Sequence, residues 1–480
     1  MLKKISIFFL VIMLCLCSAT SCVIEIDDRT EGGETSPETT LQTDKLLEHI
    51  PPMEDVLEQS KLNAEKNLSQ VFTDKNFEGI ELSVIIVEDT EKMFSVNGVT
   101  SYGRAVKEMS KLISKKLGCT LNVWAVPYDT FLKDAQSALD SGLFYADLVC
   151  VPQKAIGYLK NNNLIADLNA LYGDVFAYES YNSSAIAQFS GNNKVYGVAG
   201  NGTVSPEAYS CVYLNKSVSD AYGLTSEIYE AVNNGTWTLD LMLGYKERCA
   251  ERHPDIVSIG ADSIDSFIES AFSASGMNYM TSSLSTLPAV ANNGARLDNL
   301  VAKLRNVTAD AASFVGAENA HELFAQEKLL FYVDTLGFSS TLNGNFTVLP
   351  MPKVDAEQDK YYTPANENAY AFCVLTSNNR TQYAIDLIRA FNEAGDMLHD
   401  GLARDYLDHV LRNEESYKYI KDIFKSPVYD FAYTYGDSYA GVASSTYGAL
   451  KQAVTTKNTF AYYAGKQANN LKKDLTKIFS

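Results

Sequence analysis

The chain has 480 residues, 46% of them hydrophobic, which is enough to bury the cores of two large lobes. Its formal net charge of −19 at neutral pH argues against nucleic acid as a partner, because such a surface repels phosphate groups and anionic lipid. Apart from the segment at its start, no apolar run approaches the roughly 18 residues that a membrane-spanning helix needs.

The first residues have the layout of a secretory signal peptide. Lys3 and Lys4 form a basic head, and residues 5–17 are almost unbroken apolar, too short to span a bilayer as a permanent helix. Small residues follow at 18–21, as a cleavage site requires. We therefore predict a signal peptide over residues 1–21.

Cys22 directly follows the predicted cleavage site. The stretch resembles a bacterial lipobox, in which the cysteine thiol receives a diacylglycerol, although Ala19 stands where a leucine is usual. The alternative is an ordinary signal with a cysteine there by chance. Residues 23–46 have no aromatic side chain and are rich in Thr, Glu and Asp, so they cannot bury enough surface to fold. Residues 22–50 are thus predicted to be a lipidated cysteine and a flexible acidic linker.

Strands and helices alternate in the next part of the chain, after a helical lead-in predicted over residues 51–78. The segment 80–87 is a continuous apolar run rich in β-branched residues, which is typical of a strand buried on both faces. The segments 119–126 and 146–151 are predicted to be the second and third strands. Amphipathic helical patterns separate them. This rhythm predicts a parallel sheet with right-handed crossovers, in which ligands bind at the carboxyl ends of the strands.

Further strands are predicted beyond residue 200. Apolar runs indicate strands at 209–218, 328–337, 346–353 and 369–377. The segment from 226 to about 327 and the tail beyond 381 have mostly helical patterns. Trp124 and Trp237 are predicted to pack in the core.

Several motifs, taken in order, resemble the extracellular solute-binding proteins of bacterial ABC importers, in the large sugar-binding family. No motif is decisive alone, but their order and spacing carry the resemblance across residues 79–480. Departures from the family pattern include Asn193, Ala199, Leu214 and the pair Gln326-Glu327. The motifs are "ADLVCVPQKAIGYLKNNNLIADLNAL", "NKVYGVAG", "VYLNKSVSDAYGL", "NNGTWTLDLML", "LFAQEKLLFYVDTLG", and "FTVLPMPK" followed by "YYTPANENAYAFCV".

The resemblance implies an α/β, two-lobed periplasmic-binding-protein-like fold of type II, with a ligand cleft between the lobes. We expect an N-terminal lobe from 79–200 plus 328–370 and a C-terminal lobe from 201–327 plus 371–480. The glycines at 197–202 suit a hinge. The implied function is capture of an oligosaccharide and its delivery to the membrane subunits of an ABC importer, by a monomer without cofactor, held on the extracellular face of the cell membrane by the lipid on Cys22.

A sugar site needs aromatic rings for C–H faces and carboxylates or amides for hydroxyls. Candidates stand at strand ends and at predicted crossings between the lobes. For the carboxylates the alternative is a solvated loop or a strand-end cap, and for Tyr128 a rim position. The predicted ligand-binding residues are Glu88, Asp89, Tyr128, Gln153, Tyr209, Asp334, Asn368 and Tyr370.

Catalytic and metal patterns are weak. The five histidines show no metal-ligand spacing, and no G-x-S-x-G elbow is present. Residues 355–367 have alternating carboxylates but lack the glycine and glutamate of a calcium loop, which predicts a solvated loop. The five cysteines after Cys22 are expected to be mostly free thiols, with one disulfide left open. Three alternative functions also stay open: a binding protein for a peptide or polyamine, a surface-attached carbohydrate-active enzyme, and a signalling ectodomain that passes its ligand to a sensor.

Overall fold

The computed structural model describes residues 51–88, 101–173, 181–250, 255–309, 314–316, 318–342, 344–406, 408, 411 and 414–480. The predicted signal peptide, Cys22, the linker and Asp89 lie outside the described residues. Within the described part of the chain, no helix is both long enough and apolar enough to cross a membrane.

The first sheet forms from the apolar strands near the start, in the order β14-β3-β1-β2. β1 (Glu81–Glu88) pairs in parallel with β2 (Thr120–Pro127) and β3 (Leu148–Pro152), as predicted, and β14 (Tyr370–Cys373) runs antiparallel to β3. β2 is an edge strand, so Trp124 is 40% exposed and its predicted core position is wrong. The helices that follow the three parallel strands are α2 (Ser101–Leu117), α3 (Tyr128–Ser141) and α4 (Gln153–Asn161).

The second sheet has the order β10-β7-β11-β6-β12, with β6 antiparallel to both of its neighbours. Every residue of β6 and β12 is buried, as expected for strands covered on both faces. Trp237 is also buried here, as predicted, and its indole N–H donates to the carbonyl of Pro350 at 3.0 Å. The strands are β6 (Ser210–Asn215), β7 (Val257–Ala261), β10 (Phe314–Gly316), β11 (Leu329–Thr335) and β12 (Phe346–Leu349).

Strand pairing corrects two sequence-based expectations. The expected N-terminal lobe includes residues 328–370, but β11 and β12 belong to the sheet of β6. The expected C-terminal lobe begins again at residue 371, but β14, which spans Tyr370–Cys373, belongs to the sheet of β1. The apolar pattern identifies a buried strand but not the distant strand that it pairs with. The segment from 226 to about 327 was expected to be mostly helical, yet it contains β7, β10 and a hairpin of β8 (Met280–Ser283) and β9 (Thr286–Val290).

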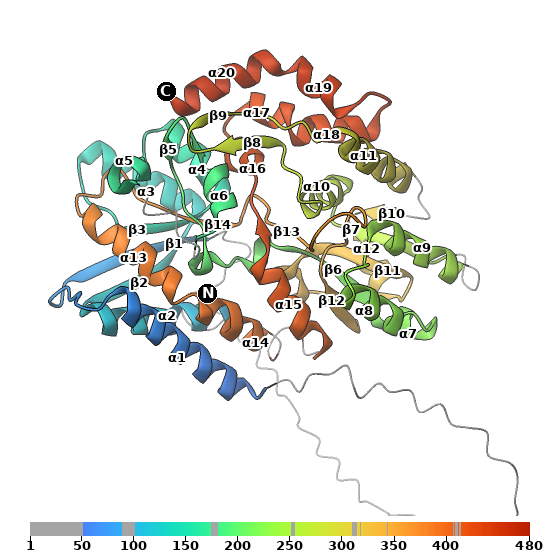
Figure 1. Ribbon diagram of the computed structural model, residues 1–480, viewed down its shortest axis with the longest axis horizontal. Helices are drawn as coiled ribbons and strands as arrows, with labels where there is room; N and C mark the ends of the chain where they lie inside the picture. Colours follow the sequence, from blue (N-terminus) through green and yellow to red (C-terminus); the bar gives the residue numbers. More distant parts are fainter. Residues whose placement is uncertain are drawn as a thin grey trace, which may run out of the picture. The chain divides into compact units, whose positions relative to one another are not determined.

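Helices cover the sheets and fill the C-terminal part of the chain (Figure 1). α13 packs against β3 and α2, whereas α16 and α20 pack against α4, and α18 packs against α10 and α11. The remaining helices are α1 (Met53–Val71), α5 (Leu168–Tyr172), α6 (Ser183–Gln188), α7 (Lys216–Ala221), α8 (Thr225–Asn233), α9 (Leu239–Ala250), α10 (Ile264–Ala274), α11 (Gly294–Ala309), α12 (Glu318–Ala325), α13 (Thr381–Glu393), α14 (Leu402–Tyr406), α15 (Glu415–Lys425), α16 (Phe431–Tyr435), α17 (Ala440–Ser445), α18 (Tyr447–Thr455), α19 (Phe460–Lys466) and α20 (Ala468–Phe479).

Three segments that connect the two sheets are hydrogen-bonded to one another. β13 (Thr363–Pro364) pairs in parallel with β15 (Pro427–Val428), and Tyr209 forms an antiparallel bridge with Ala365. The amide of Asn366 donates to the carbonyl of Ala208 at 3.0 Å. These bonds make a joint between the sheets, which we call the crossing joint: residues 205–210, 363–370 and 426–430. The predicted hinge at 197–202 stays a prediction.

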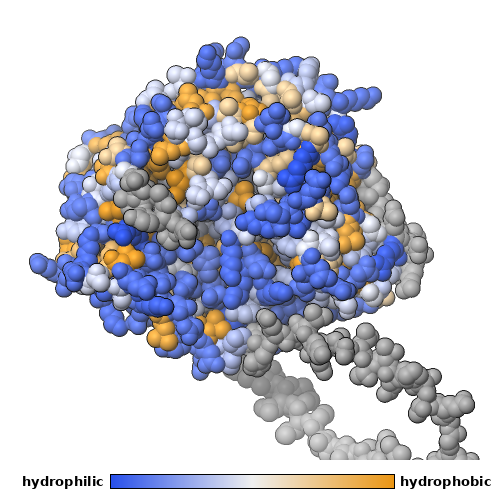
Figure 2. Space-filling model, viewed as in Figure 1, coloured by the Kyte–Doolittle hydropathy of each residue, from blue (hydrophilic) through white to orange (hydrophobic). Residues whose placement is uncertain are grey.

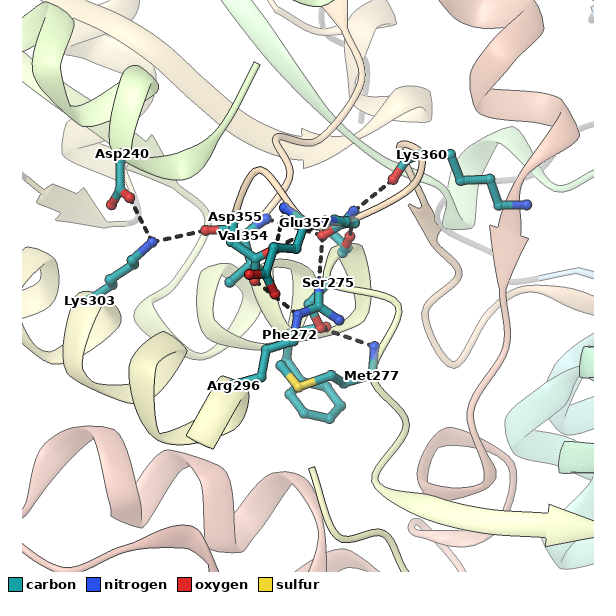
Figure 3. Close-up of polar contacts among 12 residues, drawn as sticks. Asp240, Phe272, Ser275, Met277, Arg296, Lys303, Val354, Asp355, Glu357 and Lys360 are labelled. Atoms are coloured by element: carbon teal, nitrogen blue, oxygen red, sulfur yellow. Dashed lines mark hydrogen bonds and ion pairs between the residues drawn. The ribbon is translucent and has the colours of Figure 1, made fainter. Parts of the chain in front are cut away.

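The acidic loop after β12 is solvated only in part: Glu357 and Asp359 are exposed, as predicted, whereas Asp355 and Gln358 are bonded to the helices beside the loop. Arg296 on α11 donates to the carboxylate of Asp355 at 2.9 Å (Figure 3). The ammonium of Lys303 donates both to the carboxylate of Asp240, at 2.7 Å, and to the carbonyl of Val354, at 2.9 Å. The side chain of Gln358, which is 5% exposed, accepts from the amide of Val354 at 3.1 Å. The loop is therefore part of the packed structure.

A buried carboxylate in the first sheet allows a stability test. Asp147 is fully buried and accepts hydrogen bonds from the amide of Ser83 at 2.8 Å and from Arg380 at 2.5 Å. The Asp147→Asn variant leaves Arg380 without its counter-charge, so we expect the free energy of unfolding to fall by about 2–4 kcal/mol in urea titrations.

The matched control is Glu65→Gln, which removes an exposed ion pair with Lys115 at 3.0 Å. It should change the free energy of unfolding by less than about 1 kcal/mol. Equal effects of the two substitutions would contradict the structural role of Asp147.

Candidate ligand-binding site

A cavity of about 390 Å³ lies at the carboxyl ends of the three parallel strands of the first sheet. This is the edge at which open α/β sheets bind ligands, and the volume lies in the range of small-molecule pockets. Its walls come from strand ends, from the first turns of α2, α3 and α4, and from the crossing joint. The lining residues are Val87, Glu88, Tyr102, Pro127, Tyr128, Asp129, Thr130, Pro152, Lys154, Ser205, Pro206, Glu207, Asn368 and Tyr370.

Glu88 is the buried carboxylate of the cavity. It is the last residue of β1 and is 2% exposed. Both of its carboxylate oxygens lack a hydrogen-bond partner among the residues that the structure describes. Burial raises the pKa of Glu88 from 4.5 to about 7, because removal from water disfavours the charged form. A buried acceptor without a partner among the described residues, on a side chain that lines a cavity, is a candidate to receive the hydroxyl groups of a bound molecule.

Three tyrosines supply the flat apolar surfaces. The rings of Tyr102 and Tyr370 lie 6.0 Å apart with an interplanar angle of 30°. Tyr128 begins α3, and the ammonium of Lys154 lies 5.4 Å from the centre of its ring. Burial raises the pKa of Tyr128 to about 12, so its hydroxyl stays neutral at physiological pH. Such rings pack well against the C–H faces of sugars.

The crossing joint contributes the opposite wall. The hydroxyl of Ser205 accepts a hydrogen bond from the amide of Tyr370 at 2.8 Å, which fixes the start of β14 beside residues 205–207. Glu207 lies against Gly337, where a Cβ atom would come within 1.8 Å of its carboxylate. Gly337 is therefore needed for the position of Glu207. Asn368 and Lys154 complete the polar lining with amide and ammonium groups.

The structure brings together half of the predicted ligand-binding residues. Glu88, Tyr128, Asn368 and Tyr370 all line the cavity. Glu88 is the last residue of β1, Tyr128 begins α3, Asn368 lies in the crossing joint and Tyr370 begins β14. Their proximity therefore depends on the tertiary fold. Their role in binding stays a prediction.

Three other predicted residues make structural contacts instead. Gln153 is fully buried, and its side chain donates to the carbonyls of Ala365 at 3.1 Å and Asn366 at 2.7 Å. Tyr209 is 1% exposed and packs edge-on against Phe424. Asp334 accepts hydrogen bonds from its neighbours on β11, the hydroxyl of Tyr332 at 3.1 Å and the amide of Thr335 at 2.6 Å. None of the three lines the cavity.

Among the lining residues that sequence reasoning missed are Lys154, Tyr102, Ser205 and Glu207. Lys154 is one position from the predicted Gln153, and Tyr102 is the second residue of the helix after β1. Both positions follow from the rule that helix starts lie beside strand ends, so this signal was available in the sequence. Ser205 and Glu207 lie on the crossing joint, whose path the sequence did not reveal.

The described residues contain no group of three or more His, Cys, Asp or Glu side chains placed to hold a metal ion. Cys119, Cys150, Cys211, Cys249 and Cys373 are free thiols, as expected for most of them. The cavity lining is thus suited to hydrogen bonding and aromatic packing with a small molecule.

No protein-family model matches the chain. No curated protein matches it either. Among solved structures, an ABC substrate-binding protein from Listeria monocytogenes in complex with cycloalternan is similar, with a TM-score of 0.51, 12% identity, and coverage of 83% of this chain and 99% of that chain. The galacto-N-biose-/lacto-N-biose I-binding protein of the ABC transporter from Bifidobacterium longum, in complex with lacto-N-biose, has a TM-score of 0.53, 13% identity, and coverage of 84% and 99%.

At these identities the likeness establishes the fold. The chain has the two-lobed α/β fold of periplasmic binding proteins, which confirms the fold class predicted from the sequence.

The buried Glu88 makes stability depend on pH in a defined direction. Its folded-state pKa is raised, so the folded protein binds a proton more tightly than the unfolded chain between about pH 4.5 and 7. Stability is therefore lost as the pH rises through this window. Glu88→Gln is neutral at every pH, and we expect it to be more stable than the wild type at pH 8, by a difference on the order of 3 kcal/mol, and similar at pH 4.

Thermal or urea unfolding at the two pH values measures this difference. Glu81→Gln is the matched control, because Glu81 is the exposed first residue of the same strand. A Glu88→Gln variant whose advantage over the wild type does not grow with pH would contradict the raised pKa.

Proposed function

We propose that this protein is an extracellular solute-binding protein that captures an oligosaccharide in the cavity and delivers it to the membrane subunits of an ABC importer. The observation that carries the proposal is the cavity itself. It combines a buried carboxylate, which has no hydrogen-bond partner among the described residues, with three tyrosine rings at the carboxyl ends of parallel strands. The solved structures with the same fold include receptors in complex with cycloalternan and lacto-N-biose, which supports a carbohydrate ligand.

Each kind of side chain in the cavity has a role in this account. The rings of Tyr102, Tyr128 and Tyr370 pack against sugar C–H faces, which are apolar. Glu88 accepts hydrogen bonds from hydroxyl groups, and Lys154 donates to hydroxyl or ring oxygens. The protein binds its solute without changing it, so it is not an enzyme. The proposed site needs no cofactor or metal.

We further propose that the lipid on Cys22 holds the protein on the extracellular face of the cell membrane. The linker of residues 22–50 then keeps the folded part away from the bilayer, and a monomer presents its solute to the permease. The support is the layout of the first 22 residues together with the low aromatic content of the linker.

Thermal unfolding in the presence of candidate solutes tests the function. A ligand that binds only the folded state adds about 2.7 kcal/mol at a hundred times its dissociation constant, which raises the midpoint. We expect a shift with one class of oligosaccharide, recovered unchanged afterwards. A shift with peptides or polyamines alone would replace the proposed solute, and a cleaved glycan would contradict the binding role.

The Tyr128→Ala variant tests whether the cavity is the site. Loss of the ring should weaken glycan binding by about twofold to tenfold, measured by titration calorimetry, because an aromatic contact contributes about 0.5–1.5 kcal/mol. Tyr158→Ala is the matched control, since Tyr158 lies on the neighbouring helix α4, is 37% exposed and is not part of the cavity lining. Unchanged affinity in Tyr128→Ala would place the ligand elsewhere.

Lipidation is tested by phase separation in a detergent that clouds on warming. The wild-type protein should enter the detergent phase, whereas Cys22→Ser should stay in the aqueous phase because it has no acceptor thiol. Cys17→Ser is the control, since Cys17 lies inside the predicted signal peptide. Equal partitioning of wild type and Cys22→Ser would contradict the anchor.

A further inference from the structure

We propose that ligand capture is coupled to release of a proton from Glu88, so that the affinity of the cavity is set by the acidity of the medium. The inference rests on the proposed function and adds a regulation of the same site. In this account Glu88 carries a proton in the empty cavity, and the hydroxyl groups of the ligand displace it.

The first support is geometric. Glu88 is 2% exposed, lines the cavity, and has no hydrogen-bond partner for either carboxylate oxygen among the described residues. A carboxylate charge without partners is costly in such a place, whereas a neutral carboxylic acid is tolerated. In this account Glu88 is therefore a neutral carboxylic acid as long as no ligand is bound.

Among the residues that the structure describes, the groups around Glu88 do not supply a compensating charge. Tyr102 on α2, Cys150 on β3 and Tyr370 on β14 are its near neighbours, and burial raises the pKa of each well above its ordinary value. They are therefore neutral at physiological pH. From the crossing joint, Glu207 adds a second carboxylate to the cavity wall.

The start of α3 contributes Tyr128, whose ring lies below the ammonium of Lys154, and the acidic Asp129. Lys154, at the start of α4, is the basic residue among the described residues of the lining. Its ammonium is directed to an aromatic ring 5.4 Å away and makes no ion pair with Glu88 in the described structure. The described surroundings thus favour the neutral form of Glu88 in the empty cavity.

Ligand binding reverses this preference. Hydroxyl groups that donate to both oxygens favour the carboxylate, and the proton leaves to solvent. Because burial raises the pKa of Glu88 to about 7 in the empty cavity, the protein releases about half a proton per ligand at pH 7. The carboxylate fraction rises about tenfold from pH 6 to pH 8, and the affinity should rise by the same factor.

Titration calorimetry of the full chain in a non-ionic detergent tests this coupling. The probes are lacto-N-biose, maltotriose and cycloalternan, each titrated at pH 6, 7 and 8. Phosphate and Tris buffers differ in ionisation enthalpy, so the difference in apparent heat counts the protons released. We expect an affinity about tenfold higher at pH 8 than at pH 6, and proton release at pH 7.

Two variants separate Glu88 from other buried acids. Glu88→Gln should bind with an affinity independent of pH and release no proton. Asp430→Asn is the matched control, because burial also raises the pKa of Asp430 to about 7, but its carboxylate accepts from the amides of Tyr279 at 3.0 Å and Ala432 at 2.8 Å, outside the cavity lining. This variant should keep the pH dependence of the wild type.

The outcomes distinguish the two proposals. A glycan that binds with the same affinity at pH 6 and pH 8 overturns the proton coupling and leaves the binding function intact. If none of the three glycans binds, the proposed function fails for these sugars. Infrared difference spectra of the wild type against Glu88→Gln then measure the ionisation of Glu88 and decide the inference without a ligand. A Glu88 side chain that is already ionised at pH 6 overturns the proton coupling, and one that ionises between pH 6 and pH 8 supports it.

Discussion

The site depends on the hydrogen bonds that hold the crossing joint against the end of β3. The buried side chain of Gln153 donates to two carbonyls of this joint and accepts from the hydroxyl of Thr434 at 3.0 Å. The backbone N–H of Gln153 also donates to the carbonyl of Ala369 at 2.7 Å. One amide side chain therefore connects the first sheet, a segment between the sheets and α16. A buried group with this many partners is costly to remove, so we assign it to structure.

The same joint places the ligand-facing groups. Because residues 365–369 are held at the end of β3, Asn368 and Tyr370 face the ends of β1 and β2. The bond between Ser205 and the amide of Tyr370 then brings Glu207 to the same cavity. Glu88 lies at the cavity because it is the last residue of β1. The other polar groups of the lining come from segments far apart in the sequence. The position of Glu88 therefore follows from a single strand, whereas the positions of the other cavity walls depend on the tertiary fold.

This division explains what the sequence predicts. The strands and helices of the first sheet follow from local periodicity, and the position of Glu88 follows from the end of β1. Gln153 and Lys154 are neighbours at the start of α4, and the sequence does not show which of them faces the cavity. The assignment of β11 and β12 failed because strand pairing is non-local. Glu88 lies near Tyr102, Cys150 and Tyr370, which come from three different elements, so the burial that raises its pKa is a property of the tertiary fold.

The central claim is that the cavity at the end of β1 receives a carbohydrate. The most direct measurement is a crystal structure of the protein with the glycan that gives the largest thermal shift. The account predicts a sugar ring in this cavity, packed against the tyrosine rings, with hydroxyl groups within hydrogen-bond distance of both oxygens of Glu88. A glycan bound elsewhere on the protein, with the cavity free of sugar, would contradict it.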